Sequence, residues 1–371
     1  MDARAGGPYV EVRRDDRSAG VCVTWEVHRQ MLVSDPAAPG LQLSSGLIEG
    51  DFNYPQAWGY LPTILDHFPG TAAENAPPGT DPARLFTGIN FLMGGLDDGP
   101  LVLLGSSAPG PGGLVPTHYH RTDTFRMTVG SEKQQMKDAG DWLGEGDFLV
   151  LGANAVYTQT LSTGGFRDLV IEADRRGSAS LETKRDPDEI IEELEAGQAE
   201  RFAHTWRCHR RDEDAISGVA ATFATPMGKR QRILGSISQD QDWDVLSDGS
   251  RVGAIFLADP ESGPVVVLSH NAPGAIESPD ATYGGDRFRL ILKGSCSVAG
   301  KAYTKGQFRV SEAGTVDGPV VHGPEGSSQL LVLADRRTWL PDDGAGIGAT
   351  SRLAELDSIL SPPSAANPDR S

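Results

Sequence analysis

Two histidines separated by one residue, His118 and His120, are of a type and spacing that suits metal binding. On a β-strand, residues i and i+2 point to the same face, so both imidazoles can be offered to one ion. Asp123 shares the alternation of Phe125 and the apolar residues that follow it, and we expect this face to point into a core. A buried carboxylate beside two imidazoles favours a divalent cation. The pattern therefore predicts a metal site with His118, His120 and Asp123 as ligands.

The same residues allow an interpretation without a metal. The imidazoles of His118 and His120 can instead form hydrogen bonds inside a pocket. Asp123 also has a counterpart, Asp286, in a similar stretch of sequence that contains no histidine. Such a recurrence suggests a structural role, for example accepting hydrogen bonds from the amides of a turn. Both interpretations stay open at this stage.

A repeat within the chain explains this counterpart. Residues 99–110 (GPLVLLGSSAPG) align without a gap on residues 263–274 (GPVVVLSHNAPG). Three more pairs of blocks follow in the same order and with similar spacing: DTFR at 123–126 with DRFR at 286–289, GDF at 146–148 with GQF at 306–308, and ADRR at 173–176 with ADRR at 334–337. Several matches in one order indicate an internal duplication.

Apolar residues alternate inside each repeat: Phe125, Met127 and Val129 in the first, Phe288, Leu290 and Leu292 in the second. A period of two predicts strands with one face in a core. By the same alternation, Arg126 and Arg289 fall on the opposite face, and we expect them on the outside of the structure, paired with acidic neighbours. Short apolar runs at 100–105, 264–268 and 330–334 predict buried strands.

The segment around His118 and His120 resembles the first of two motifs of the cupin superfamily, in which glycine, His-x-His, a glutamate and a second glycine follow at set intervals. Gly112 and the two histidines fit that motif, and Asp123 stands seven residues before Gly130, where the family has its glutamate. The turn at 146–148 resembles the start of the second motif, which ends in a histidine. Here that last position is Tyr157.

The resemblance covers about half of the chain and implies an all-β fold of two jelly-roll barrels produced by the duplication. The second copy has no His-x-His and offers Tyr283 and Asp286 in the corresponding stretch, so the resemblance implies one metal site, in the first barrel. Tyr157 can bind the metal as a phenolate, act as a general acid or base, or fill the pocket with its hydroxyl satisfied. We take Tyr157 as the candidate catalytic residue.

Two helices are predicted. Asp186 as N-cap and Pro187 in the first turn predict a helix from residue 186 to about 207, which would link the barrels, and a second, short helix is predicted at 351–360. The expected organisation is an N-terminal barrel domain with an extension (1–184), a helical linker (185–215), a C-terminal barrel domain (216–345), and a short helix with a disordered tail (346–371).

A divalent ion at this site, whether Fe, Mn, Ni or Zn, suits two chemistries: dioxygenation, or stabilisation of an enolate by a lyase or isomerase. The two-barrel plan is similar to that of gentisate- and quercetin-type cupin dioxygenases, whereas a tyrosine near the metal is similar to cupin lyases. The alternative is a non-catalytic two-barrel protein that binds a small ligand or has a structural role. Both imply a small molecule as partner. Dimerisation is common among cupins, so a homodimer is a further expectation.

Charge and composition narrow the choice of partners. Lys and Arg total 33 against 51 Asp and Glu, a formal charge of −18, which would repel nucleic acid and anionic membrane surfaces. The three cysteines are too far apart in the sequence for a disulfide framework or a thiolate zinc site. The polar N-terminus lacks the apolar stretch of a secretory signal. We therefore expect a cytoplasmic protein with neither nucleic acid nor membrane as partner.

Overall fold

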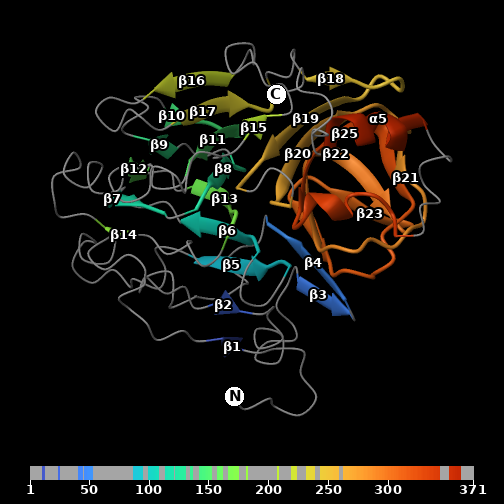
Figure 1. Cartoon of the computed structure of the whole chain (residues 1–371), viewed down its shortest axis with the longest axis horizontal. Helices are drawn as coiled ribbons and strands as arrows, with labels where there is room; N and C mark the ends of the chain where they lie inside the picture. The colour runs from blue at the N-terminus through green and yellow to red at the C-terminus, as the bar shows by residue number, and fades with distance from the viewer. Residues whose placement is uncertain are drawn as a thin grey trace. The chain divides into compact units, whose positions relative to one another are not determined.

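The computed structural model describes the following residues, and every structural statement below concerns them alone: 11–12, 24–25, 41–44, 46–52, 87–94, 99–107, 113–120, 122–130, 134–136, 142–152, 157–161, 166–174, 181–182, 207–208, 219–223, 231–238, 243–258, 262–342 and 351–360. Across these ranges the chain is built almost entirely of antiparallel strands, with one 3-10 turn and one α-helix (Figure 1). The predicted all-β class is confirmed.

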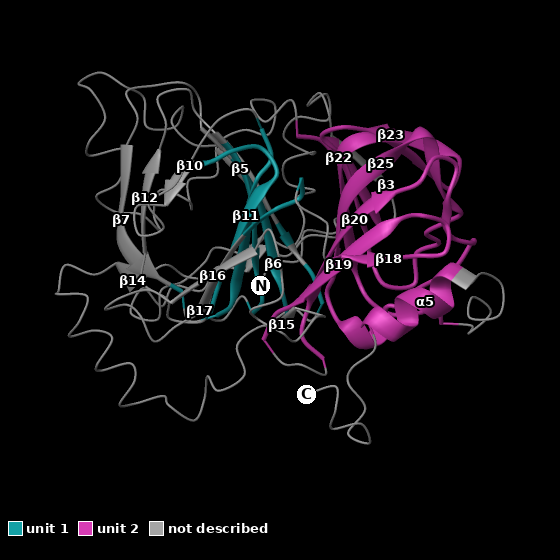
Figure 2. Ribbon diagram, turned by 90° about the horizontal axis from the view of Figure 1, so that it is seen from above, with its two compact units in different colours: residues 1–39, 54–205, 219–238 teal, residues 40–53, 206–218, 239–371 magenta. Residues whose placement is uncertain are grey.

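Two compact units divide the chain, and each takes up segments that are distant in sequence (Figure 2). Unit 1 consists of residues 1–39, 54–205 and 219–238, and unit 2 of residues 40–53, 206–218 and 239–371. The first repeat lies in unit 1 and the second in unit 2. The expected boundaries near residues 184 and 216 made each barrel one continuous stretch, whereas the observed units are interleaved.

Unit 1 holds two main sheets. The seven-stranded sheet runs in the order β16 (Val219–Phe223), β17 (Gln231–Ser236), β11 (Asp147–Leu151), β8 (Thr124–Thr128), β13 (Phe166–Glu172), β6 (Leu101–Ser107) and β5 (Thr87–Leu92). The five-stranded sheet runs in the order β10 (Trp142–Leu143), β9 (Gln134–Met136), β12 (Tyr157–Leu161), β7 (Gly113–Tyr119) and β14 (Leu181–Glu182). Near the N-terminus, β1 (Glu11–Val12) pairs with β2 (Thr24–Trp25).

In unit 2 the strands join into one large sheet. Its main path is β15 (Arg207–Cys208), β19 (Arg251–Phe256), β20 (Val265–Asn271), β25 (Val320–Leu333), β22 (Arg287–Val298), β24 (Gln307–Ser311), β4 (Leu47–Asp51) and β3 (Leu41–Ser44). Off this path, β18 (Asp244–Val245) pairs with β19, β21 (Ile276–Ser278) with β25, and β23 (Lys301–Thr304) with β22. The predicted strands at 264–268 and 330–334 correspond to β20 and the end of β25.

Bends in two long strands fold this sheet over on itself. The pairing of β22 with β25 shifts register between Ile291 and Lys293 and again between Gly294 and Cys296. Such bulges bend a strand sharply, so one strand can serve two layers. Gly294 has φ +69°, and a Cβ there would lie 2.2 Å from the carbonyl oxygen of Gly326. Glycine is needed at this point because the two bending backbones touch.

Equivalent strands of the two repeats receive a pairing strand from a distant segment. In unit 1, β17 pairs along β11, and in unit 2, β4 pairs along β24. The same kind of backbone hydrogen bond holds the turns that begin β11 and β24. Ile237 donates its N–H to the carbonyl of Gly146 (2.9 Å), and Phe52 donates its N–H to the carbonyl of Gly306 (2.8 Å). The added strand covers an edge that would otherwise expose unpaired backbone groups.

Both faces of the central strands are buried, which overturns one expectation from the sequence. Phe125 stacks on Phe148 in unit 1, and Phe288 stacks on Phe308 in unit 2, so the apolar face is a core, as predicted. However, Arg126 and Arg289 on the opposite face are only 6% and 3% exposed. The prediction that these arginines lie outside was wrong, because alternation separates two faces without showing that one of them meets solvent. The predicted pairing with acidic residues is confirmed, Arg126 with Asp168 and Arg289 with Glu277.

The helix predicted at 351–360 is confirmed as α5 (Ser351–Leu360). Its buried residues Leu353, Leu356 and Leu360 pack into one cluster with residues of β19, β20 and β25, including Val267 and Leu331. The helix predicted from 186 lies outside the described residues, and Arg207, at its expected end, belongs to strand β15. The predicted disordered tail also lies outside the described residues.

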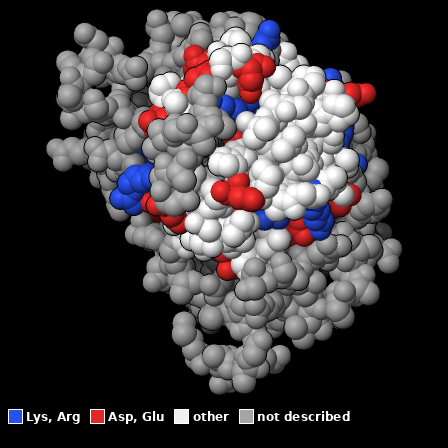
Figure 3. Space-filling model, turned by 90° about the vertical axis from the view of Figure 1, so that its right-hand side faces the viewer, with Lys and Arg blue, Asp and Glu red and all other residues white. Residues whose placement is uncertain are grey.

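Charged side chains on the described part of one face are mixed in sign (Figure 3). Basic and acidic groups there lie side by side around a broad uncharged area. Among the described residues, no helix has the length and apolar character required to span a bilayer. The expectations about nucleic acid, membrane and homodimer partners stay predictions.

The packing of α5 leads to a stability prediction. Leu353→Ala should lower the free energy of unfolding by about 2–5 kcal/mol, because a fully buried leucine leaves a cavity when it is truncated. Ala354→Ser, on the exposed side of the same helix, is the matched control and should have almost no effect. Thermal and urea denaturation followed by circular dichroism measure both. An equal, small effect of the two changes would contradict the packing of α5.

Candidate functional site

The interior of the first barrel is marked by a buried pair, His120 and Glu172. His120 directly follows β7 of the five-stranded sheet, and Glu172 ends β13 of the seven-stranded sheet. The Nδ1 atom of His120 lies 3.3 Å from Oε1 of Glu172, and both side chains are less than a tenth exposed. Because the contact joins residues of two different sheets, the face of β13 that carries Glu172 is the one turned into the barrel.

The same interior face includes Arg126 and Asp168. Thr124, Arg126 and Thr128 on β8 lie opposite Glu172, Val170 and Asp168 on β13, and directly opposed residues share a face of the sheet. The Nε of Arg126 lies 3.3 Å from Oδ2 of Asp168, and both are buried. The Phe125 face, with which Asp123 shares its parity, is therefore turned away from this interior.

Burial dominates the acidity of Asp168. Removal of its carboxylate from water raises the pKa of Asp168 to about 7, although the charge of Arg126 acts in the opposite direction. A carboxyl group that is half protonated near neutral pH can accept or give up a proton there. Buried groups of this kind are found more often at functional sites than elsewhere.

Of the predicted site residues, His118 and Tyr157 are described by their backbone alone. Tyr157, the first residue of β12, is the direct cross-strand partner of His118 on β7. On the other side of β7, Glu182 of β14 is also a partner of His118. The strand register thus brings two predicted site residues, far apart in sequence, to neighbouring positions on one sheet.

Asp123 is buried, at 3% exposure, and its backbone carbonyl accepts a hydrogen bond from the N–H of Ala173. Asp286 has the same backbone contact with Ala334, and its side chain also accepts a hydrogen bond from the N–H of Ala313 (2.8 Å). Asp286 therefore has the turn-binding role suggested for this repeated position. That Asp123 is a metal ligand stays a prediction. The alternation that it shares with Phe125 no longer supports it, because the Phe125 face is turned away from the barrel interior.

Within the part of the chain whose side chains are described, no three His, Cys, Asp or Glu residues gather closely enough to hold a metal ion. That part includes His120, Asp123 and Glu172, so a metal at His120 would need ligands from elsewhere. His118, whose side chain is outside this part, is the predicted second ligand. Glu172 was missed by the sequence analysis because it lies far from His120 along the chain.

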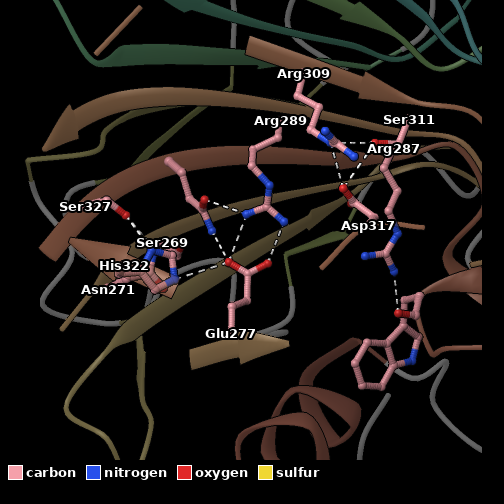
Figure 4. A network of polar contacts seen from close by, with 12 residues as sticks. Ser269, Asn271, Glu277, Arg287, Arg289, Arg309, Ser311, Asp317, His322 and Ser327 are labelled. Atoms are coloured by element: carbon pink, nitrogen blue, oxygen red, sulfur yellow. Dashed lines mark hydrogen bonds and ion pairs between the residues drawn. The ribbon is translucent and has the colours of Figure 1, made fainter. Parts of the chain in front are cut away.

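The second barrel contains a larger buried polar network (Figure 4). Arg289 of β22 forms a two-pronged ion pair with Glu277 of β21, at 2.8 Å and 3.0 Å, and also donates to Gln329 of β25 at 2.6 Å. His322 places Nε2 3.4 Å from Glu277, and its Nδ1 lies 2.8 Å from the hydroxyl of Ser327. Burial tends to raise the pKa of Glu277, but Arg289 and His322 outweigh it and hold the pKa well below its ordinary value.

A second part of this network surrounds Arg309 of β24. Its Nε donates to Oδ1 of Asp317 at 2.8 Å, and Ser311 donates to the same oxygen at 3.2 Å. Glu49, carried by the distant strand β4, lies 3.6 Å from Arg309 and pairs with Lys301 at 2.7 Å. The strand taken up from the N-terminal part of the chain thus contributes a charge to the interior of the second barrel.

Neither family models nor curated proteins produce a match to this chain. Solved structures with a similar fold include a cupin 2 conserved barrel domain protein from Leptotrichia buccalis (12% identity, covering 71% of this chain and 94% of that one, TM-score 0.39). The protein Ylba from E. coli matches at 10% identity, covering 83% of this chain and 97% of that one, with a TM-score of 0.43. A single-residue variant of oxalate decarboxylase from B. subtilis matches at 15% identity, covering 81% of this chain and 76% of that one, with a TM-score of 0.36.

These solved structures are cupin-type proteins, the superfamily whose motifs the sequence resembles. The likeness is one of fold, and at these identities and scores it carries no argument about activity. The residues of the two barrels therefore have to support any function on their own.

Proposed function

We propose that the first barrel binds a divalent metal ion through His118 and His120 and acts there on a small organic molecule. The buried contact between His120 Nδ1 and Glu172 is the observation that carries this proposal. Metal-binding histidines usually direct their second ring nitrogen to a carboxylate or carbonyl, which fixes the ring and raises its basicity. Glu172 would have this positioning role, and His120 would bind the metal through Nε2.

The donor set fits the metals expected from the sequence. Imidazole nitrogens suit iron, nickel and zinc, and manganese would need a carboxylate ligand in addition. When bound, such an ion supplies Lewis acidity or a site for oxygen to the substrate. The buried interior around His120 would exclude water and orient a small molecule.

Two residues of the first barrel can handle protons in this proposal. Tyr157 would act as general acid or base beside His118, its partner across the strands. Asp168, with a pKa of about 7, can hold a proton on the same interior face as Glu172. A lyase or isomerase that forms an enolate has to remove a proton from its substrate. Two groups that can accept and return a proton therefore favour this class of enzyme over a dioxygenase.

Metal analysis tests the proposal. Protein purified without added metal should contain iron, manganese, nickel or zinc close to one equivalent per chain, and the His118→Ala, His120→Ala variant should lose it. Glu172→Gln should weaken metal affinity by about 10- to 100-fold, because the ring of His120 is no longer held by a charge. Elemental analysis and competition with a chelator measure these effects.

The matched control for the metal test is His270→Ala in the second barrel. His270 stacks on Trp243 and contacts the hydroxyl of Ser328, so this change removes an imidazole without touching the first barrel. Its metal content should equal that of the native protein. Metal at background level in the native protein would contradict an enzyme of this kind and favour the alternative, a non-catalytic protein that binds a small ligand.

A change at Tyr157 separates two roles for its hydroxyl. If Tyr157 transfers protons, Tyr157→Phe should retain the metal at native stoichiometry, because the imidazoles still hold it. If the phenolate is a ligand, the same change should weaken metal binding as much as the loss of a histidine does. Metal content and chelator competition decide between the two, and the first result is expected.

The raised pKa of Asp168 predicts a pH dependence of stability. The folded chain keeps a proton on Asp168 that the unfolded chain releases above its ordinary pKa of 3.8. The resulting stabilisation is complete below pH 3.8 and is lost as the pH rises to about 7. Asp168→Asn removes this effect, so its melting temperature should rise relative to the native protein between about pH 5 and pH 7, with a limiting slope of about 1.4 kcal/mol per pH unit.

Melting curves of both proteins at matched ionic strength check this expectation. A difference in melting temperature that stays constant with pH would show that Asp168 titrates at its ordinary pKa, and one that shrinks as the pH rises would show a lowered pKa; either result contradicts the expectation. The comparison needs no substrate, so it remains informative whatever the reaction is.

A further inference from the structure

Two buried arginines of the polar network in the second barrel contact carboxylates. Arg289 pairs with Glu277, and Arg309 pairs with Asp317 and lies 3.6 Å from Glu49, which also pairs with the half-exposed Lys301. A third arginine, Arg287, lies two residues before Arg289 on β22 and therefore on the same inward face.

Arg287 is buried, with 6% of its surface exposed, and no described carboxylate lies within ion-pair distance of it. Its Nη2 donates to the backbone carbonyl of Trp339 at 2.6 Å, and its Cζ lies 3.1 Å from the centre of the Tyr283 ring. A carbonyl and an aromatic face stabilise a cation, but neither neutralises its charge. Figure 4 shows the guanidinium of Arg287 turned away from the Arg289–Glu277 pair.

Two polar atoms at this point are buried without a hydrogen-bond partner in the described part of the chain: Nε of Arg287 and the hydroxyl of Tyr283. Tyr283 itself is 2% exposed. Buried donors are almost always satisfied in proteins, because a donor that loses its bonds to water without gaining a new partner destabilises the fold. A single acceptor bound between these two touching side chains would satisfy both groups.

The repeat places this pair where the first barrel has its candidate metal site. The matched blocks DTFR and DRFR align Arg287 with Thr124. Across the strands, Thr124 faces Glu172, whereas Arg287 faces Leu333. At the positions of Thr124 and Glu172, the second barrel thus has a guanidinium and a leucine.

We propose that the second barrel binds a small organic carboxylate through the guanidinium of Arg287 and the hydroxyl of Tyr283. A guanidinium presents two parallel N–H groups that match the two oxygens of a carboxylate, and the tyrosine adds a third donor. A carboxylate would give Arg287 the direct anionic contact that Arg289 and Arg309 have. A phosphate dianion needs more donors than these two residues offer.

The acidity of the two arginines agrees with this assignment. Burial lowers the pKa of Arg287, and the charges around it, Asp317 and Glu277 among them, offset this effect only in part. Burial also disfavours the charge of Arg289, but the pairing with Glu277 outweighs it and raises the pKa of Arg289. A bound carboxylate would give Arg287 the compensation that Arg289 already has.

Titration calorimetry on the full chain tests the proposal, with acetate, succinate and benzoate as probes against sodium chloride at matched ionic strength. At least one carboxylate should bind saturably at one site per chain, and inorganic phosphate should bind more weakly. Arg287→Met should reduce carboxylate affinity by at least about tenfold, and Tyr283→Phe by a smaller factor. Arg337→Met, which removes an exposed arginine paired with Asp335, should bind as the native chain does.

Stability and metal controls separate a lost site from a lost fold. Without carboxylate, Arg287→Met should melt no lower than the native protein, because it removes a buried charge that has no carboxylate in contact. Arg289→Met should melt clearly lower, because Glu277 then stays buried without its ion-pair partner. The His118→Ala, His120→Ala variant should bind carboxylate normally. No saturable binding of any probe, native affinity in Arg287→Met, or loss of binding in the double histidine variant would each overturn the proposal.

Discussion

A charge that is buried inside a barrel needs a partner brought by another strand, and this requirement organises both interiors of the protein. Arg289 satisfies it through Glu277 and Gln329, which come from two other strands. Arg126 satisfies it through Asp168 on the neighbouring strand. Because a guanidinium is planar and directional, each pair also fixes how the contributing strands approach one another. The polar interiors therefore help to specify the packing that surrounds them.

The two barrels use one backbone plan for different charge chemistry. Asp168 and Gln329 occupy corresponding places, and each contacts the arginine at the shared position of its repeat. The change from a carboxylate to an amide alters the acidity of the interior while the contact is kept. The positions of Thr124 and Arg287 differ more strongly, since one faces an acidic residue and the other is itself a cation. Duplication thus preserved the strands and let the interior charges diverge.

The features that were predicted correctly from the sequence are those that depend on the local pattern of residues or on the internal repeat. Alternating apolar residues located the central strands, and the spacing of leucines located α5. The face of β8 that points into the barrel could not be predicted. β8 is buried on both sides, and alternation alone does not show which of two buried faces lines the interior. Glu172 escaped notice for a related reason: it meets His120 only after β13 has folded beside β8. Of the four predicted site residues, His120 and Asp123 have described side chains, while His118 and Tyr157 are placed by strand register alone.

The pairing of β4 with β24 and of β17 with β11 ties the two halves of the gene product together. A cut anywhere between residues 184 and 216 would leave each fragment carrying a strand that belongs to the other. Each fragment would then expose an unpaired sheet edge, an invitation to aggregation or to exchange of strands between molecules. Mixing the two fragments could restore both sheets, because each fragment carries the strand that the other lacks. Each half of the chain therefore depends on a strand from the other half to complete its sheet.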